Sequence, residues 1–263
     1  MDGDVPVRIG VVLSGGGLRG ASHLGVLQRL IEYRIPIDVI VGSSAGAIIA
    51  AYYAAVGLSL EELVQDAGRF RGRHLLAHIL NVRLRGRMTG GSLAKRSGII
   101  PERLALLEQA SFDRLYHHVR GIGIVCHDLS SGRPSYFATG ADHGVRLSDV
   151  VRASASIPFL LPPIPVECPD DRSTLLLTDG GVSDCLPIRF AQQPPLGATH
   201  LIVSDSRWVA GGKPSSDGRV VYARPRLPST GTLWAPASTL ASAVREGKRA
   251  INEAMLQTIL GWT

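Results

Sequence analysis

Cysteine is scarce in this sequence, and its placement argues against two kinds of domain. Three cysteines occur in 263 residues, at Cys126, Cys168 and Cys185. They form neither the paired spacing of a disulfide framework nor the clusters that bind metal ions. The sequence therefore argues against a disulfide-stapled secreted domain and a zinc module. It predicts three reduced thiols in a cytosolic protein, with no metal site.

Long hydrophobic runs are missing as well. No stretch approaches the roughly 20 apolar residues of a membrane-spanning helix. The start of the chain, Met1–Asp4, lacks the basic and apolar regions of a signal peptide. These absences predict a cytoplasmic protein, whose contact with the inner membrane surface would be peripheral.

Charge is unevenly distributed along the chain, whose net charge is +6. The segment from Arg69 to Arg103 contains nine basic residues and one acidic residue, Glu102. Such a segment suits an anionic surface, so we expect it to contact an anionic membrane. Aromatic residues make up 5% of the chain, and no basic platform interleaved with aromatics accompanies the charge, so lipid is favoured over nucleic acid. The alternative is a solvated face without a partner.

The order of the predicted elements indicates one α/β domain over residues 1–263. A hydrophobic content of 45% and a charged content of 19% are typical of a globular protein. Strands are predicted at 7–13, 37–41, 121–126, 134–138 and 199–204, and helices at 21–33, 45–57, 101–109, 147–155 and within 235–260. Because strands alternate with helices, the sequence predicts a three-layer α/β/α fold with a mainly parallel central sheet.

A serine lies in a tight, glycine-flanked turn between a predicted strand and a helix. The segment Gly42-Ser43-Ser44-Ala45-Gly46 has the G-x-S-x-G pattern of a nucleophile elbow. Its glycines leave room for a sharp turn, and the start of the helix favours a developing negative charge near Ser44. The alternative is an ordinary strand-to-helix turn, since short motifs also arise by chance.

A second glycine-rich segment, Gly15-Gly16-Gly17-Leu18-Arg19-Gly20, follows the first predicted strand. It fits the dinucleotide fingerprint, but the acidic residue that such a site needs is misplaced, because Asp38 begins the second strand. A dinucleotide-binding oxidoreductase is therefore a remote alternative. Ala21 stands where a P-loop requires lysine. The segment is better interpreted as a cradle of backbone N–H groups for an oxyanion.

The serine hydroxyl needs a base, and the histidines are poorly placed to supply one. His200 is predicted to begin a strand, and His23 is predicted to pack within the first helix. The remaining candidate is Asp179, followed by Gly180 and Gly181. An aspartate can take the serine proton directly if it lies within hydrogen-bond reach. An Asp-Gly-Gly turn without a catalytic role is the alternative.

Together these motifs resemble the patatin-like phospholipase family. The resemblance extends over about residues 7–204, with Ala21–Leu27 similar to the family's first helix, Ala153–Phe159 to its Ala-Ser and Ile-Pro block, and Asp179–Ile188 to its Asp-Gly-Gly block. One departure is Cys185, where the family usually has asparagine, and loss of that amide would loosen the Asp179 turn.

The resemblance implies a modified α/β-hydrolase architecture and a Ser–Asp dyad that cleaves lipid acyl esters, with no cofactor. Ser44 would be the nucleophile and Asp179 the proton acceptor. The oxyanion hole would comprise Gly16, Gly17 and Ala45. Supporting motif positions would be Gly15, Arg19, Gly20, Gly42, Gly46, Gly180 and Gly181, with Arg19 expected to orient the glycine-rich loop rather than to meet a phosphate. The alternatives are a lipid transacylase with the same dyad and a non-catalytic lipid-binding relative.

Overall fold

The computed structural model describes residues 6–69, 99–141, 144–170, 172–208, 218–227 and 237–263. The basic segment is described at its two ends, Arg69 and Arg103, whereas residues 70–98 lie outside the described parts. The predicted membrane contact through this segment therefore stays a prediction.

The described residues form one eight-stranded mixed sheet. Along the sheet the strand order is β5-β6-β3-β2-β1-β7-β8, and β4 also pairs with β3. The strands β3, β2, β1, β7 and β8 are parallel to one another, whereas β4, β6 and β5 join through antiparallel pairings. Their bounds are Ile9–Leu13 (β1), Val39–Ser43 (β2), Gly121–Asp128 (β3), Arg133–Ala138 (β4), Ile164–Cys168 (β5), Ser173–Asp179 (β6), His200–Ser204 (β7) and Val220–Ala223 (β8).

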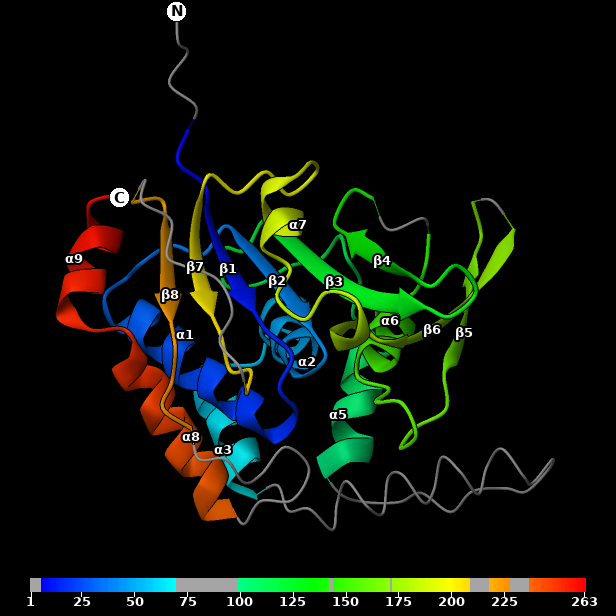
Figure 1. Cartoon of the computed structure of the whole chain (residues 1–263), viewed down its shortest axis with the longest axis horizontal. Helices are drawn as coiled ribbons and strands as arrows, with labels where there is room; N and C mark the ends of the chain where they lie inside the picture. Colours follow the sequence, from blue (N-terminus) through cyan, green and yellow to red (C-terminus); the bar gives the residue numbers. More distant parts are fainter. Residues whose placement is uncertain (1–5, 70–98, 142–143, 171, 209–217, 228–236) are drawn as a thin grey trace, which may run out of the picture.

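Helices cover the two faces of the sheet unequally (Figure 1). The thick layer contains α1 (Ser22–Glu32), α2 (Ala45–Ala50) with the π-helical turn η2 (Ala51–Val56), α3 (Leu60–Arg69), α5 (Ile99–Leu107), α6 (Leu147–Ser154), α8 (Ala237–Ala250) and α9 (Glu253–Leu260). In the described part of the chain, the opposite face is covered by the short α7 (Ile188–Gln192) and the residues that follow it. The predicted α/β fold with a mainly parallel sheet is confirmed, with one thin outer layer.

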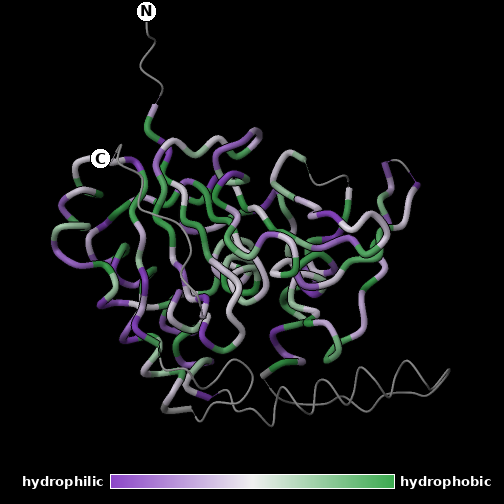
Figure 2. Tube along the Cα trace, viewed as in Figure 1, coloured by the Kyte–Doolittle hydropathy of each residue, from purple (hydrophilic) through white to green (hydrophobic). Residues whose placement is uncertain are grey.

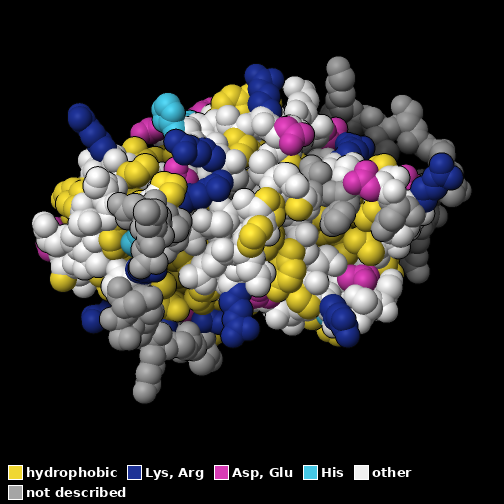
Figure 3. Space-filling model, turned by 90° about the horizontal axis from the view of Figure 1, so that it is seen from above, with side chains coloured by type: hydrophobic (Ala, Val, Ile, Leu, Met, Phe, Trp, Pro, Cys, Tyr) yellow, Lys and Arg dark blue, Asp and Glu magenta, His cyan; other side chains and the backbone are white. Residues whose placement is uncertain are grey.

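Both cores follow from the alternation of strand side chains. In β1, Val11 and Leu13 face the large core under the thick helical layer, and Val12 faces the small core under α7. Strands buried on both faces read as continuous apolar runs, and they are correspondingly green in Figure 2, whereas α8 and α9 carry purple polar residues. On the face shown in Figure 3, Lys and Arg side chains lie at separate places among apolar and acidic ones. None of the described helices is long and apolar enough to cross a membrane.

The C-terminal region forms two helices, which corrects the prediction of one long helix within 235–260. Asn252 adopts an extended backbone conformation between α8 and α9, and its side-chain oxygen accepts a hydrogen bond from the Met255 amide at 2.9 Å. Asparagine is a preferred N-cap residue, because its side chain satisfies one of the free N–H groups that begin a helix. The apolar periodicity continues across this cap, so periodicity alone did not reveal the break.

Two glycines allow α1 and α8 to pack backbone against backbone. A Cβ atom on Gly25 would lie 1.8 Å from the Val244 carbonyl oxygen, and a Cβ on Gly247 would lie 1.8 Å from the Ser22 carbonyl oxygen. Neither gap can widen without separating the two helices.

We expect Gly25→Ala to lower the free energy of unfolding by about 1–3 kcal/mol or more, because the methyl group overpacks this contact. Gly68→Ala in α3 is the matched control, since a Cβ there meets nothing within 4 Å. In a helix this substitution should stabilise by roughly 0.5–1 kcal/mol. Urea unfolding of both variants tests the prediction, and equal midpoints would contradict it.

Candidate active site

Ser44 lies in a strained turn between β2 and α2. It has φ 53° and ψ −120°, a conformation that residues with a side chain rarely adopt. A Cβ on Gly42 would lie 2.3 Å from the Gly46 carbonyl carbon, and a Cβ on Gly46 would lie 2.2 Å from the Leu13 carbonyl oxygen. Both flanking glycines are therefore required by close backbone packing, and the turn presents the Ser44 side chain beyond the end of the sheet.

The Ser44 hydroxyl donates a hydrogen bond to Asp179. The distance from Ser44 Oγ to Asp179 Oδ2 is 2.7 Å. Asp179 ends β6 and precedes the short helical turn η3 (Gly180–Val182), and its other oxygen, Oδ1, accepts a hydrogen bond from the Gly181 amide at 2.8 Å. The two side chains belong to residues that are 7% and 6% exposed. A carboxylate thus lies within proton-transfer distance of a nearly buried serine.

Burial raises the pKa of the Asp179 carboxyl above its usual value of 3.8. Hydrogen bonds from Ser44 and from the Gly181 amide act in the opposite direction, because they stabilise the charged form. A carboxylate with a raised pKa is a stronger base, so this environment suits the removal of a proton from a hydroxyl group.

Ser154, to which the sequence analysis assigned no role, forms a hydrogen bond with the backbone of the serine turn. The Ser44 amide donates to Ser154 Oγ at 2.9 Å, and this hydroxyl in turn donates to the Val125 carbonyl at 2.6 Å. Ser154 ends α6, which lies against β3. Its place in the Ala-Ser block was the available signal, but the contact joins residues 110 positions apart.

The glycine-rich loop after β1 lies directly against the serine turn. A Cβ on Gly15 would lie 3.4 Å from the Ser44 Cβ, and a Cβ on Gly20 would lie 2.6 Å from the Ala45 Cβ. The Gly15 amide donates to the Cys185 carbonyl at 2.9 Å. The loop, the serine turn and the segment after Asp179 therefore meet beyond the carboxyl ends of β1 and β2.

Three backbone amides at these strand ends are candidate donors for an oxyanion. The Gly16 amide has no hydrogen-bond partner among the described residues. Gly17 begins the short helix η1 (Gly17–Ala21) and Ala45 begins α2, and the first N–H groups of a helix have no acceptor within it. Gly17 has φ 56°, a conformation that glycine adopts readily.

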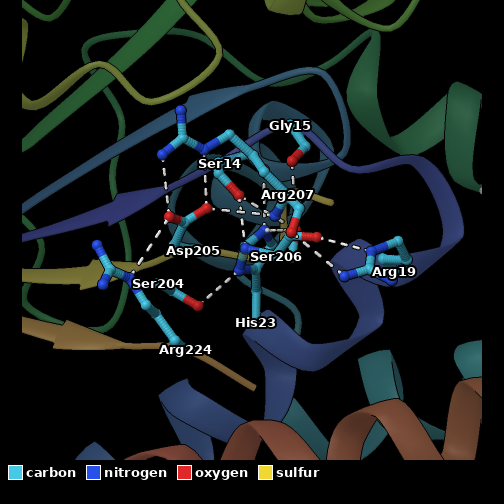
Figure 4. A network of polar contacts seen from close by, with 9 residues as sticks. All are labelled: Ser14, Gly15, Arg19, His23, Ser204, Asp205, Ser206, Arg207 and Arg224. Atoms are coloured by element: carbon cyan, nitrogen blue, oxygen red, sulfur yellow. Dashed lines mark hydrogen bonds and ion pairs between the residues drawn. The ribbon is translucent and has the colours of Figure 1, made fainter. Parts of the chain in front are cut away.

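The Arg19 side chain points toward the segment after β7 (Figure 4). Its Nε donates to the Ser206 carbonyl at 2.8 Å, and its Nη2 donates to the Arg207 carbonyl at 3.3 Å. The guanidinium carbon also lies 4.9 Å from the centre of the Trp208 ring. These contacts favour the expected loop-orienting role over a phosphate contact.

Neither histidine considered as a base contacts the Ser44 hydroxyl. His200 begins β7 and pairs in register with Ile9, at the opposite end of the strands from Ser44. His23 is fully buried, and its ring nitrogens contact the Ser204 hydroxyl and the Ser14 carbonyl. Asp38 also lies at the opposite end of the strands from Ser44, where it accepts a hydrogen bond from the Ile9 amide, at the start of β1, at 2.9 Å. The last contact agrees with the weakness of the dinucleotide alternative.

Cys185 packs beside the glycine-rich loop. Its thiol cannot replace the side-chain amide of the asparagine that the resemblance led us to expect at this position. A Cβ on Gly15 would lie 2.9 Å from its sulfur. The Asp179 turn is closed instead by the Asp179–Gly181 hydrogen bond and by the amides of Ser183 and Asp184, which donate to the Gly180 carbonyl. Burial raises the pKa of the Cys185 thiol, which disfavours the thiolate that a cysteine nucleophile requires.

A largely apolar cavity of about 560 Å³ adjoins the glycine-rich loop and the serine turn. Ser44 and Asp179 do not line it, but Gly17 and Ala45, which neighbour the dyad, do. The described lining also includes an ion pair between Arg103 Nε and Asp66 Oδ2 at 2.6 Å. The apolar lining comes mainly from α2, α5 and the segment after α6, through Ile48, Ile49, Leu104, Leu107, Leu161, Pro162, Pro163 and Ile164.

Most of the chain matches one known protein family. The model of the family described as patatin-like phospholipase matches residues 11–191. An uncharacterized NTE family protein of Mycobacterium tuberculosis is 31% identical over 181 residues, covering 68% of this chain and 27% of the relative. A lysophospholipase of Emericella nidulans is 31% identical over 207 residues, covering 75% of this chain and 12% of the relative. The chain thus spans about a quarter or less of the length of these curated relatives.

Solved structures show the same fold at low sequence identity. VipD from Legionella pneumophila superposes with a TM-score of 0.55 at 16% identity, covering 98% of this chain and 67% of that one. Human GIVD cytosolic phospholipase A2 superposes with a TM-score of 0.53 at 11% identity, covering 100% of this chain and 60% of that one.

Proposed function

Because this chain belongs to the patatin-like phospholipase family, we propose that it is a serine acyl hydrolase that cleaves the acyl esters of lipids. The single observation that carries the proposal is the 2.7 Å hydrogen bond from Ser44 Oγ to Asp179 Oδ2. A lipid substrate is supported by the relative named lysophospholipase and by the apolar cavity beside the dyad.

In the proposed acylation step, Ser44 Oγ attacks the ester carbonyl carbon while its proton passes to Asp179 Oδ2. The carbonyl oxygen becomes an oxyanion and accepts hydrogen bonds from the amides of Gly16, Gly17 and Ala45. Each donor of this kind contributes about 2.7–4 kcal/mol to acyl transfer. The intermediate then collapses, Asp179 returns the proton to the leaving alcohol, and the acyl group remains on Ser44.

In the proposed deacylation step, Asp179 takes a proton from water, whose oxygen attacks the acyl carbon. Collapse of the second tetrahedral intermediate releases the fatty acid and returns the proton to Ser44. The same carboxyl group therefore acts as base and acid in both halves of the cycle.

The direct test is release of fatty acid from a lysophospholipid by the purified chain, followed by mass spectrometry. Hydrolysis predicts free fatty acid and the deacylated headgroup. Appearance of a diacyl lipid in place of free fatty acid would instead identify the transacylase alternative. Absence of both products, with binding of the lipid retained, would identify a non-catalytic lipid-binding protein.

We propose that the apolar cavity holds the acyl chain of the substrate. Its volume of about 560 Å³ falls within the range typical of ligand pockets, about 300–1,000 Å³. Burial of one methylene group contributes about 0.8 kcal/mol, so kcat/KM should rise roughly fourfold for each carbon that the cavity accepts.

We expect Leu104→Trp to shorten the longest acyl chain that is cleaved efficiently, because Leu104 lines the cavity from α5. Hydrolysis of short esters should be retained. Leu106→Trp is the matched control, since Leu106 lies on the same helix, is 38% exposed and does not line the cavity. Measuring kcat/KM over a series of nitrophenyl esters tests the prediction, and identical chain-length profiles for both variants would contradict it.

A further inference from the structure

A buried polar cluster lies behind the glycine-rich loop, and the proposed reaction does not use it. Ser14, His23, Ser204 and Ser206 have no exposed surface, and Figure 4 shows their side chains gathered between β1, α1 and the end of β7. Ser204 and Ser206 lie beyond the residues 11–191 that match the family model. Polar groups buried so completely are retained when their hydrogen bonds fix a geometry.

His23 holds the peptide between Ser14 and Gly15. Its Nε2 lies 2.9 Å from the Ser14 carbonyl oxygen, which can only accept, so Nε2 carries the proton. Its Nδ1 then accepts from the Ser204 hydroxyl at 2.7 Å. Burial lowers the pKa of His23 to about 4, so the ring is neutral and keeps this tautomer at neutral pH. On the opposite side of the same peptide, the Gly15 amide donates to the Cys185 carbonyl.

Ser206 holds the next peptide, between Gly15 and Gly16. Its hydroxyl donates to the Gly15 carbonyl at 3.3 Å. The Ser14 hydroxyl lies 3.1 Å from the Ser206 hydroxyl and accepts from the Ser206 amide at 2.9 Å. Because the Ser206 hydroxyl donates its proton to the Gly15 carbonyl, the Ser14 hydroxyl donates to Ser206. The hydroxyl protons of Ser14 and Ser206 therefore both have an acceptor.

This arrangement determines the direction of the Gly16 amide. In a trans peptide the carbonyl and the following N–H point to opposite sides of the chain. Since the Gly15 carbonyl is directed at Ser206, the Gly16 N–H points away from Ser206. The contact is tight, because a Cβ on Gly16 would lie 2.4 Å from Ser206 Oγ. Glycines on both sides of this peptide give the backbone little resistance of its own to rotation.

We propose that Ser206 is a positioning residue for the oxyanion hole, holding the Gly15–Gly16 peptide so that the Gly16 amide is presented to the acyl oxygen. Neutral His23 holds the preceding peptide in the same way. Without these contacts the peptide can turn its carbonyl toward the substrate, where it would repel the oxyanion. The inference rests on the proposed acyl hydrolase function.

The test is Ser206→Ala in the full chain, assayed with a short nitrophenyl ester and with a reversible trifluoromethyl ketone. The ketone forms a tetrahedral adduct with the nucleophile, and that adduct carries an oxyanion. We expect kcat to fall about 10–100-fold, less than the 10²–10³-fold lost with a direct donor. KM should stay unchanged, and the ketone Kd should rise by the same factor as kcat/KM falls. Ser206→Thr, which keeps the hydroxyl, should restore both values.

Ser22→Ala is the matched control, because Ser22 is also fully buried near the loop and its hydroxyl has no hydrogen-bond partner in the described part of the chain. It should leave the kinetics unchanged. If Ser206→Ala does not fold, Ser206→Cys, which keeps a weak donor at nearly the same volume, replaces it and should show the same parallel loss in smaller measure. Loss of kcat without weaker ketone binding, or kinetics equal to those of Ser22→Ala, would overturn the inference. An inactive wild-type chain would instead overturn the proposed function.

Discussion

Ser44→Ala is expected to abolish both ester hydrolysis and covalent labelling by a fluorophosphonate probe. The hydroxyl of Ser44 is the proposed nucleophile, and it lies 2.7 Å from the carboxylate that would take its proton. Loss of the serine nucleophile or of its base lowers kcat by roughly 10⁶-fold in a well-studied serine protease. Alanine removes the reacting oxygen and leaves the backbone contacts of the turn in place.

The neighbouring Ser43 provides a matched control. Its hydroxyl is buried and has no hydrogen-bond partner among the residues that the structure describes, so Ser43→Ala deletes an equal group from the same turn without removing such a hydrogen bond. We expect this variant to keep activity and labelling. Intact labelling of Ser44→Ala, or equal loss in both variants, would contradict the assignment of Ser44 as the nucleophile.

Asp179→Asn is expected to remove hydrolysis while leaving the fold as stable as before or more so. Asparagine can still accept the hydrogen bond from the Gly181 amide, but it cannot take a proton from Ser44. Burial raises the pKa of Asp179 above 3.8, so the folded protein binds this proton more tightly than the unfolded chain does. The stability contributed by Asp179 is therefore full below about pH 3.8 and is lost as pH rises through the folded pKa.

Two measurements test this prediction. The kcat/KM of the wild type should fall as pH decreases through the raised pKa of Asp179, because the base becomes protonated. Thermal unfolding near pH 7 should give Asp179→Asn a melting temperature at or above that of the wild type. Asp184→Asn is the control, since Asp184 lies in the same segment as Asp179 and has no proposed part in the reaction. Its carboxylate accepts a hydrogen bond from the Tyr136 hydroxyl of β4. Retained hydrolysis by Asp179→Asn would contradict its role as the base.

The short-range features of the candidate site could be predicted from the sequence. The strand, turn and helix around Ser44 are encoded within one continuous segment, and the two glycine motifs indicate where the backbone must approach closely. The order of the motifs along the chain also predicted the family correctly. The catalytic roles of Ser44 and Asp179 stay predictions.

The long-range contacts could not be predicted, because no local pattern encodes them. Ser154 and Ser206 are single serines in a serine-rich chain, and their partners lie 110 and about 190 positions away. The antiparallel pairing of β6 with β3 and β5 likewise depends on packing between distant segments. The break between α8 and α9 was missed for a local reason, since the Asn252 cap interrupts an otherwise continuous apolar pattern.

The position of β7 beside β1 has a consequence for shortened versions of this chain. The family match ends at residue 191, yet β1, which leads into the glycine-rich loop, pairs on one side with β7 at His200–Ser204. A fragment cut at residue 191 would turn β1 from an interior strand into an open edge. Unpaired edges recruit strands from other molecules, so we expect such a fragment to self-associate, and a shortened chain needs β7 as well as the residues of the family match.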